Sequence, residues 1–170
     1  TLPARYPRSF SVYLRFAREK TPVFTTDETP FRVGKAEILM KSDKKPDVAI
    51  IGCGPLLHNA MRAAKELEEN GIGVTIVNNH TIKPMDERAI VAVAKEAGAV
   101  VTVEEHQVQG GMGSAVAEVL AKNHPVPMEF IGVQSRFGES GSPSELLEYF
   151  GMGVSHILDA AKRVIKRKTG

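Results

Sequence analysis

The strongest structural signal in this chain lies between residues 100 and 120. It begins with the β-branched run Val-Val-Thr-Val at 100–103, the composition of a strand that is buried on both faces. Two acids and a histidine follow at 104–106, and then a loop with three glycines. From Met112 onward, apolar residues recur at helical spacing. This order is typical of an open α/β sheet, whose polar edge is where ligands and partner chains bind.

The same alternation of strands and helices fills residues 33–170. Apolar runs predict strands over 33–40, 48–53, 73–77, 99–103 and 126–133, with amphipathic helices between and after them. Asp86 is a good N-cap, Gly98 ends the same helix, and Ser142 has capping-box spacing to Glu145. A strand–helix–strand order favours parallel strands joined by right-handed crossovers. This portion is therefore predicted to be α/β, with four or five strands.

Composition and charge give no sign of a nucleic-acid-binding, membrane-spanning or disulfide-bonded protein. The 170 residues fit one ordinary domain, and the formal net charge of +2 gives no argument for nucleic acid as a partner. No apolar run approaches the roughly 20 residues of a membrane span, and no secretory signal is visible. The single cysteine, Cys53, excludes an internal disulfide and any multi-cysteine metal site. We therefore expect a cytoplasmic protein with no nucleic-acid or membrane partner.

Basic residues gather near the C-terminus. They are Lys162, Arg163, Lys166, Arg167 and Lys168. Such a cluster can be a patch that binds polyanions, but cations in the last turns of a helix also complement the helix dipole. We interpret the cluster as a solvated helix end.

Residues 1–32 differ from the rest of the chain. They are rich in proline, and Arg5, Arg8, Arg15 and Arg18 lie close together. Residues 11–16 alternate apolar and polar side chains as a strand does. A strand without obvious partners, followed by a proline-rich linker, is typical of the end of another domain. The chain opens with Thr1 rather than methionine. We therefore expect a fragment, a processed product or one piece of a larger assembly.

The glycine loop has two interpretations that the spacing alone leaves equal. Gly110, Gly111, Gly113 and Ser114 could cradle an anion on free amides at a helix start. The same glycines could instead let the loop pass close to a neighbouring backbone. The segment is not a Walker loop, because no Gly-Lys-Ser/Thr follows. Likewise, Gly52-x-Gly54 lacks the third glycine of a dinucleotide fingerprint, so nicotinamide binding is not predicted.

The histidines indicate no metal site and no complete catalytic set. None of the five has zinc-enzyme spacing to another, and no nucleophile-elbow pattern accompanies Ser114. His106, between Glu105 and the glycine loop, could donate a proton or form a hydrogen bond at an interface. It could equally be a structural histidine satisfied by the preceding acids. We therefore predict no catalytic and no metal-binding residue.

Several ordered motifs resemble one known family. They are Glu104-Glu105-His106 with Gly110-Gly111-Met112-Gly113-Ser114-Ala115, Thr29-Pro30-Phe31-x-Val33-Gly34-Lys35, His80-Thr81-Ile82-Lys83-Pro84, and Arg136-Phe137-Gly138-Glu139-Ser140-Gly141. From about residue 12 onward, the chain resembles the C-terminal domain of transketolases, including their split, two-chain forms. The resemblance implies a three-layer α/β domain over 33–170, with a mostly parallel, mixed five-stranded sheet and helices on both faces. It also implies that 1–32 is the tail of a preceding pyrimidine-binding domain plus a linker.

The resemblance implies chemistry that lies mostly outside this chain. Transketolases use thiamine diphosphate and a divalent metal, Mg or Ca, to move a two-carbon ketol unit between sugar phosphates of the pentose phosphate pathway. The motifs that hold cofactor and metal are absent here, so we expect no cofactor and no activity from this chain alone. The arginine that matches Arg18 binds the substrate phosphate in that family.

The resemblance further implies a homodimer that works with other transketolase domains or an N-terminal subunit. The domain would support dimerisation and, through its polar edge, possible regulation or an interface. The candidate residues at that edge are Glu105, His106, Gly110, Gly111, Gly113 and Ser114. Two related families remain alternatives. One is the β subunit of 2-oxo-acid dehydrogenases, where the domain docks a partner, and the other is deoxyxylulose-phosphate synthase.

Overall fold

The computed structural model describes residues 11–17 and 20–169. Five strands form one sheet in the order β1-β3-β2-β4-β5, in which β1 is antiparallel to β3 and the other neighbours are parallel. The strands are β1 (Glu37–Lys41), β2 (Val48–Gly52), β3 (Val74–Asn78), β4 (Val100–Gln107) and β5 (Met128–Val133). The predicted five-stranded mixed sheet is confirmed.

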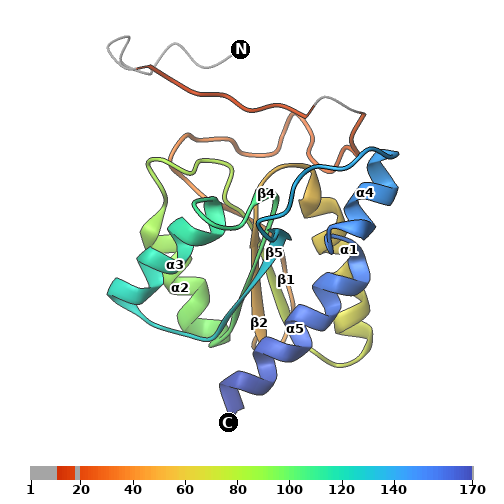
Figure 1. Cartoon of the computed structure of the whole chain (residues 1–170). Coiled ribbons are helices and arrows are strands. Elements are labelled where there is room, and N and C mark those ends of the chain that lie inside the picture. The colour runs from red at the N-terminus through yellow and green to blue at the C-terminus, as the bar shows by residue number, and fades with distance from the viewer. Residues whose placement is uncertain (1–10, 18–19, 170) are drawn as a thin grey trace.

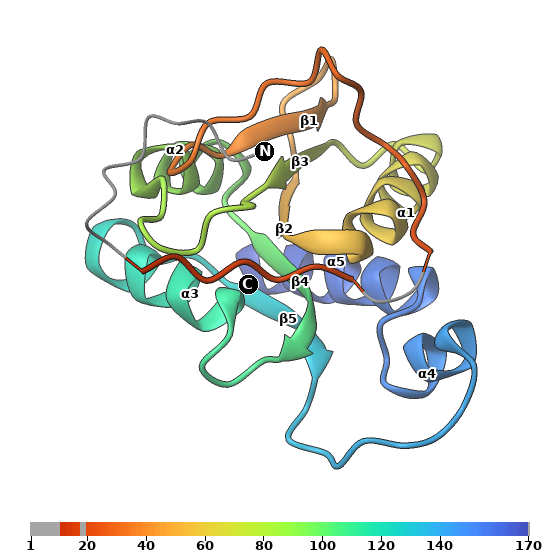
Figure 2. The ribbon, with the colours of Figure 1, turned by 90° about the horizontal axis from the view of Figure 1, so that it is seen from above.

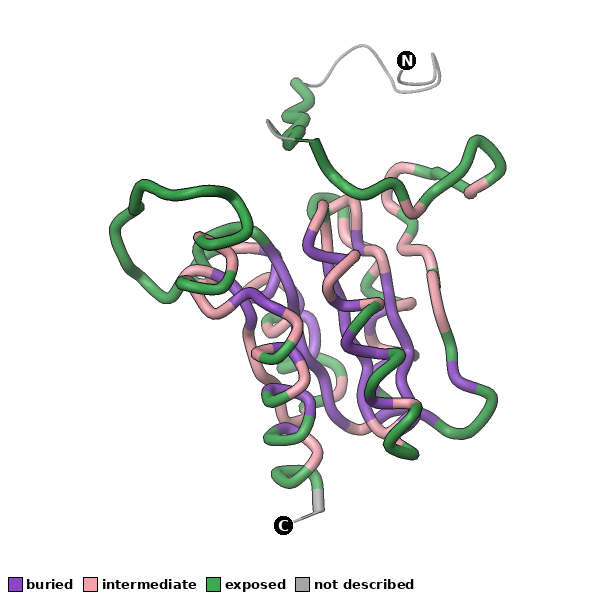
Figure 3. The backbone as a smooth tube through the Cα atoms, turned by 90° about the vertical axis from the view of Figure 1, so that its right-hand side faces the viewer, coloured by how far each residue is buried: buried purple, intermediate pink, exposed green. Residues whose placement is uncertain are grey.

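Helices cover both faces of this sheet. They are η1 (Gly54–Leu56), α1 (Leu57–Glu69), α2 (Glu87–Ala97), α3 (Met112–Asn123), α4 (Pro143–Tyr149) and α5 (Val154–Thr169). Helices α1 and α5 pack on one face, and α2 and α3 pack on the other (Figure 1). Because β2 is buried along its whole length, its run of apolar residues supplies both cores. Figure 3 shows this burial concentrated in the sheet and in the inner helix faces.

The helix ends follow the sequence signals. The Asp86 carboxylate accepts a hydrogen bond from the Ala89 amide at 3.3 Å, and Gly98 ends the same helix in the left-handed region at φ 72°. Ser142 and Glu145 form a reciprocal capping box at the start of α4. These local interactions satisfy backbone groups that a helix leaves unpaired at its ends.

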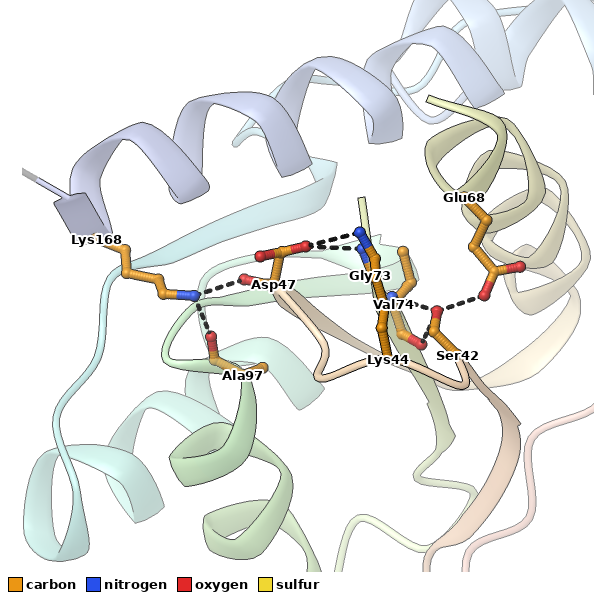
Figure 4. Close-up of polar contacts among 8 residues, drawn as sticks. All are labelled: Ser42, Lys44, Asp47, Glu68, Gly73, Val74, Ala97 and Lys168. Atoms are coloured by element: carbon orange, nitrogen blue, oxygen red, sulfur yellow. Dashed lines mark hydrogen bonds and ion pairs between the residues drawn. The ribbon is translucent and has the colours of Figure 1, made fainter. Parts of the chain in front are cut away.

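A polar network joins the amino ends of the parallel strands to the end of α5 (Figure 4). The Asp47 carboxylate accepts a hydrogen bond from the Gly73 amide at 2.8 Å. The Lys168 ammonium donates to the carbonyls of Ala97 at 2.7 Å and Asp47 at 3.3 Å. Lys168 thereby caps the last turn of α2 from another helix.

Other members of the basic cluster also have internal partners. Arg163 and Arg167 both donate to the Glu129 carboxylate on β5, and Arg167 donates to the Met128 carbonyl at 2.8 Å. These contacts hold α5 along the outer strand of the sheet. They support the interpretation of the cluster as part of a helix end.

Besides shifts of strand ends, such as β1 beginning at Glu37 because residues 33 and 34 form a turn, the structure differs from the sequence expectations at two places. Residues 11–17 form no strand; they are exposed and cross the carboxyl edge of the sheet as an extended segment (Figure 2). The expectation failed because a strand requires a hydrogen-bonded partner, which these residues do not have within the described part of the chain. Strand β4 also continues to Gln107, so the acids and His106 lie within a strand rather than beyond it. Across the described residues, no helix is both long and apolar enough to cross a membrane.

Candidate functional site

Glu104 is the centre of the polar edge that the sequence singled out. Its side chain points to the α2/α3 face near the end of β4, and the residue is only 3% exposed. The two carboxylate oxygens accept hydrogen bonds from the first amides of α3, Met112 at 2.7 Å and Gly113 at 2.8 Å. A carboxylate is well placed at a helix start, because the amides there are unpaired and the dipole favours negative charge.

The other amides of the glycine loop also have partners within the chain. The Gly110 amide donates to the Ser114 hydroxyl at 3.0 Å, and the Gly111 amide donates to the Val108 carbonyl at 3.2 Å. The Ser114 hydroxyl in turn donates to the Val108 carbonyl at 2.8 Å. An external anion would therefore have to displace Glu104 or Ser114 to use these amides.

Two of the three glycines, Gly111 and Gly113, are required by close approach. A Cβ on Gly111 would meet the Gln107 carbonyl and both oxygens of Glu104, and a Cβ on Gly113 would lie 2.5 Å from the Thr102 hydroxyl. The loop thus passes too near to β4 to carry side chains at these positions. Of the two interpretations that the spacing left equal, this geometry supports the close passage of the loop.

Glu105 and His106 are exposed at the same edge. The Nδ1 atom of His106 lies 2.9 Å from the Gln107 carbonyl and 4.0 Å from the nearer oxygen of Glu104. Because a carbonyl can only accept, Nδ1 carries the proton in this contact. His106 is therefore held beside Glu104 by the carbonyl of the next residue, and its side chain is half exposed to solvent.

Three further side chains lie at the carboxyl ends of β2 and β3. Asn79 is 1% exposed, and its Nδ2 atom has no hydrogen-bond partner in the described part of the chain. The His80 ring stacks on Phe31 with 4.4 Å between centroids, and burial lowers the pKa of His80 below its usual value. Burial, and to a lesser extent the Glu104 charge, raises the pKa of the Cys53 thiol to about 11, while Arg15 opposes the rise.

The raised pKa predicts an unreactive cysteine. Since the pKa of Cys53 moves from 9.0 to about 11, folding lowers its thiolate fraction at pH 8 by roughly 100-fold. We expect iodoacetamide to alkylate the folded chain roughly 100-fold more slowly than the chain unfolded in urea. The folded state keeps the proton between pH 9 and pH 11 where the unfolded state loses it, so stability falls as pH rises through this range. Equal alkylation rates for folded and unfolded chains would contradict this account.

All six residues predicted at the polar edge lie close together in the chain, whereas the predicted phosphate contact is not among the described residues. Glu105 and His106 lie at the end of β4, Gly110 and Gly111 lie in the loop that follows it, and Gly113 and Ser114 lie in the first turn of α3. Arg18, the predicted phosphate contact, lies outside the described residues. Glu104 was missing from the predicted site residues, although an acid at the end of a buried strand before a glycine loop is a usable signal for a helix-start carboxylate.

The described residues do not fit the cofactor that the resemblance implies. Within this part of the chain, no three His, Cys, Asp or Glu side chains are grouped to hold a metal ion. Glycine-rich helix starts can bind phosphate groups, but here the Met112 and Gly113 amides already donate to Glu104. We therefore assign no step of ketol transfer to these residues.

Comparison with known proteins identifies the family. The model of the family "Transketolase, C-terminal domain" matches residues 34–157. The chain belongs to this family. The transketolase C-terminal domain fold is also found in a solved split-gene transketolase, an inactive β4 tetramer, with a TM-score of 0.83 and 38% identity over 89% of this chain and 48% of that one.

Curated transketolases match nearly the whole chain. A 6-deoxy-6-sulfo-D-fructose transketolase subunit of Clostridium sp. (strain MSTE9) is 41% identical over 92% of this chain and 48% of its own length. A putative transketolase C-terminal section of Methanocaldococcus jannaschii is 40% identical over 91% of this chain and 47% of its length. The transketolase of Rattus norvegicus is 35% identical over 91% of this chain and 25% of its length. The chain thus spans half or less of the length of these transketolases.

Proposed function

We propose that this chain is the non-catalytic C-terminal part of a thiamine-diphosphate-dependent transketolase. The complete enzyme would transfer a two-carbon ketol unit between sugar phosphates of the pentose phosphate pathway in the cytoplasm. The observation that carries the proposal is the family match to residues 34–157 of this chain. The transketolases that it resembles are about twice its length or longer. The relatives named above are transketolases, so this activity is proposed ahead of the dehydrogenase and synthase alternatives.

The site geometry supports a structural role for this part of the enzyme. Glu104 satisfies the helix-start amides that would otherwise receive a phosphate. The cofactor and its divalent metal, Mg or Ca, would be held by polypeptide that carries the remaining motifs. What this chain contributes is a stable α/β support for that polypeptide and for a homodimer.

We propose three further roles from the family resemblance. Arg18 would bind the phosphate of the sugar substrate, as its match in transketolases does. Residues 1–32 would be the tail of a pyrimidine-binding domain plus linker, followed by the C-terminal domain at 33–170. Glu105 and His106 are exposed and could serve an effector or an interface.

A reconstitution experiment tests the proposal. The 170-residue chain alone is expected to show no ketol transfer, with thiamine diphosphate and Mg²⁺ supplied, in a coupled assay with xylulose 5-phosphate and ribose 5-phosphate. Adding the transketolase polypeptide of the same organism that carries the thiamine-diphosphate motif should give turnover that neither component has alone. Cofactor-dependent turnover by the isolated chain, or no gain on mixing, would contradict the proposal.

A further inference from the structure

Exposed aromatic side chains lie at the carboxyl edge of the sheet. Phe137, in the loop that follows β5, is 95% exposed. Tyr13 and Phe16, on the segment that crosses the same edge, are 87% and 82% exposed (Figure 2). Large apolar side chains exposed together are typical of an interaction surface. Phe137 differs from the other two because it lies on a loop that hydrogen bonds to other residues hold in place.

Hydrogen bonds fix the base of the Phe137 loop, residues 134–142. The Ser135 amide donates to the Gln107 side chain at 2.9 Å, and Gln107 donates to the Arg136 carbonyl at 3.3 Å. The Ser135 hydroxyl bonds the Gln109 side chain at 2.8 Å. At its far end, the loop enters the capping box of α4. The loop is thus tied to β4 and to α4, on either side of Phe137.

Arg136, the residue before Phe137 in the chain, contacts aromatic side chains of the kind that dominate binding energy at interfaces. The Arg136 guanidinium lies 4.5 Å from the Tyr149 ring centroid and 5.6 Å from that of Phe150, and it donates to the Tyr149 hydroxyl at 2.6 Å. Phe150 packs against the core on the α1/α5 face. We name Arg136, Phe137, Tyr149 and Phe150 the aromatic–arginine patch. Arginine and aromatic side chains are enriched at interface hot spots.

The position of the remaining polypeptide in the relatives suggests what covers this patch. The family model is the C-terminal domain, so the rest of each longer relative precedes it. That polypeptide must reach the domain through the residues before 34, of which residues 11–17 cross the carboxyl edge (Figure 2). The preceding part of a transketolase therefore approaches from the edge that carries Phe137.

We propose that the aromatic–arginine patch docks the thiamine-diphosphate-binding part of the enzyme, with Phe137 as the anchor that enters an apolar pocket. This inference rests on the proposed function and adds the contact surface to it. A loop whose ends are already held by hydrogen bonds loses less conformational freedom on docking than an unrestrained one, which favours affinity. The exposure of Phe137 means that its removal leaves the core of this domain intact.

Titration calorimetry of the full chain with that cofactor-binding polypeptide tests the proposal. Phe137→Ser should weaken the Kd by roughly 30-fold or more, as hot-spot truncations do, and Phe137→Leu should retain part of the affinity. Ile38→Ser is the matched control, since Ile38 is 56% exposed on β1, the outer strand opposite β5, and it should leave Kd unchanged. Thermal melts should coincide with that of the wild type for the two Phe137 variants.

The outcomes separate the two proposals. Wild-type binding with turnover, together with a Phe137→Ser Kd within twofold of the wild type, would overturn the anchor while leaving the proposed function standing. No complex with the wild-type chain would overturn both. If sedimentation shows that Phe137→Ser instead dissociates an assembly of this chain with itself, the occupant is a second copy and the proposal is wrong.

Discussion

Glu104→Ala is expected to lower the free energy of unfolding by about 3 to 5 kcal/mol. The substitution leaves the Met112 and Gly113 amides without their acceptor in a buried position, and each unsatisfied buried donor costs about 1 to 3 kcal/mol. It also removes a negative charge from the start of α3, where the helix dipole favours one. Urea unfolding followed by circular dichroism at pH 7 measures the effect.

The neighbouring acid provides a matched control for this experiment. Glu105 is exposed on the same strand, so Glu105→Ala should change stability by no more than about 0.5 kcal/mol. If Glu104→Ala lowers the free energy of unfolding by less than about 1 kcal/mol, the carboxylate does not stabilise the loop. Tight phosphate binding by the variant but not by the wild type would show that Glu104 occupies a usable anion site.

Gly111→Ala is expected to lower the free energy of unfolding by about 2 to 3 kcal/mol. Its φ of −85° is one that any residue adopts, so the cost arises from contact rather than from backbone strain. The new methyl group would meet the Gln107 carbonyl and the Glu104 carboxylate, and relief requires the loop to move away from β4. Overpacking of this kind typically costs about 1 to 3 kcal/mol, and weakening the Glu104 hydrogen bonds adds to it.

Gly138→Ala is the control for the glycine substitution. A Cβ on Gly138 meets nothing within 4 Å, so the free energy of unfolding should stay within about 0.5 kcal/mol of the wild type. Melts of both variants under the same conditions measure the difference. Equal melting temperatures for the two would contradict the close passage of the loop over β4.

Much of the fold could be predicted from the sequence because its signals are local. The apolar run at 48–52 is buried on both faces, as its composition indicated. Asp86 and Ser142 cap helices where their spacing to the following residues placed them. The strand expected at 11–16 failed for the complementary reason: alternation shows that a segment can pair, but the partner must be supplied by other residues.

The sequence by itself determined that this chain is an α/β domain of the transketolase C-terminal family, because periodicity, caps and ordered motifs are properties of neighbouring residues. Only the tertiary structure decided how the glycine loop is used. Whether its amides bind an external anion depends on whether another side chain reaches them, and Glu104 does so across eight residues of sequence. The same holds for Phe137, whose exposure and whose fixed loop depend on contacts with β4 and α4 that no local pattern contains.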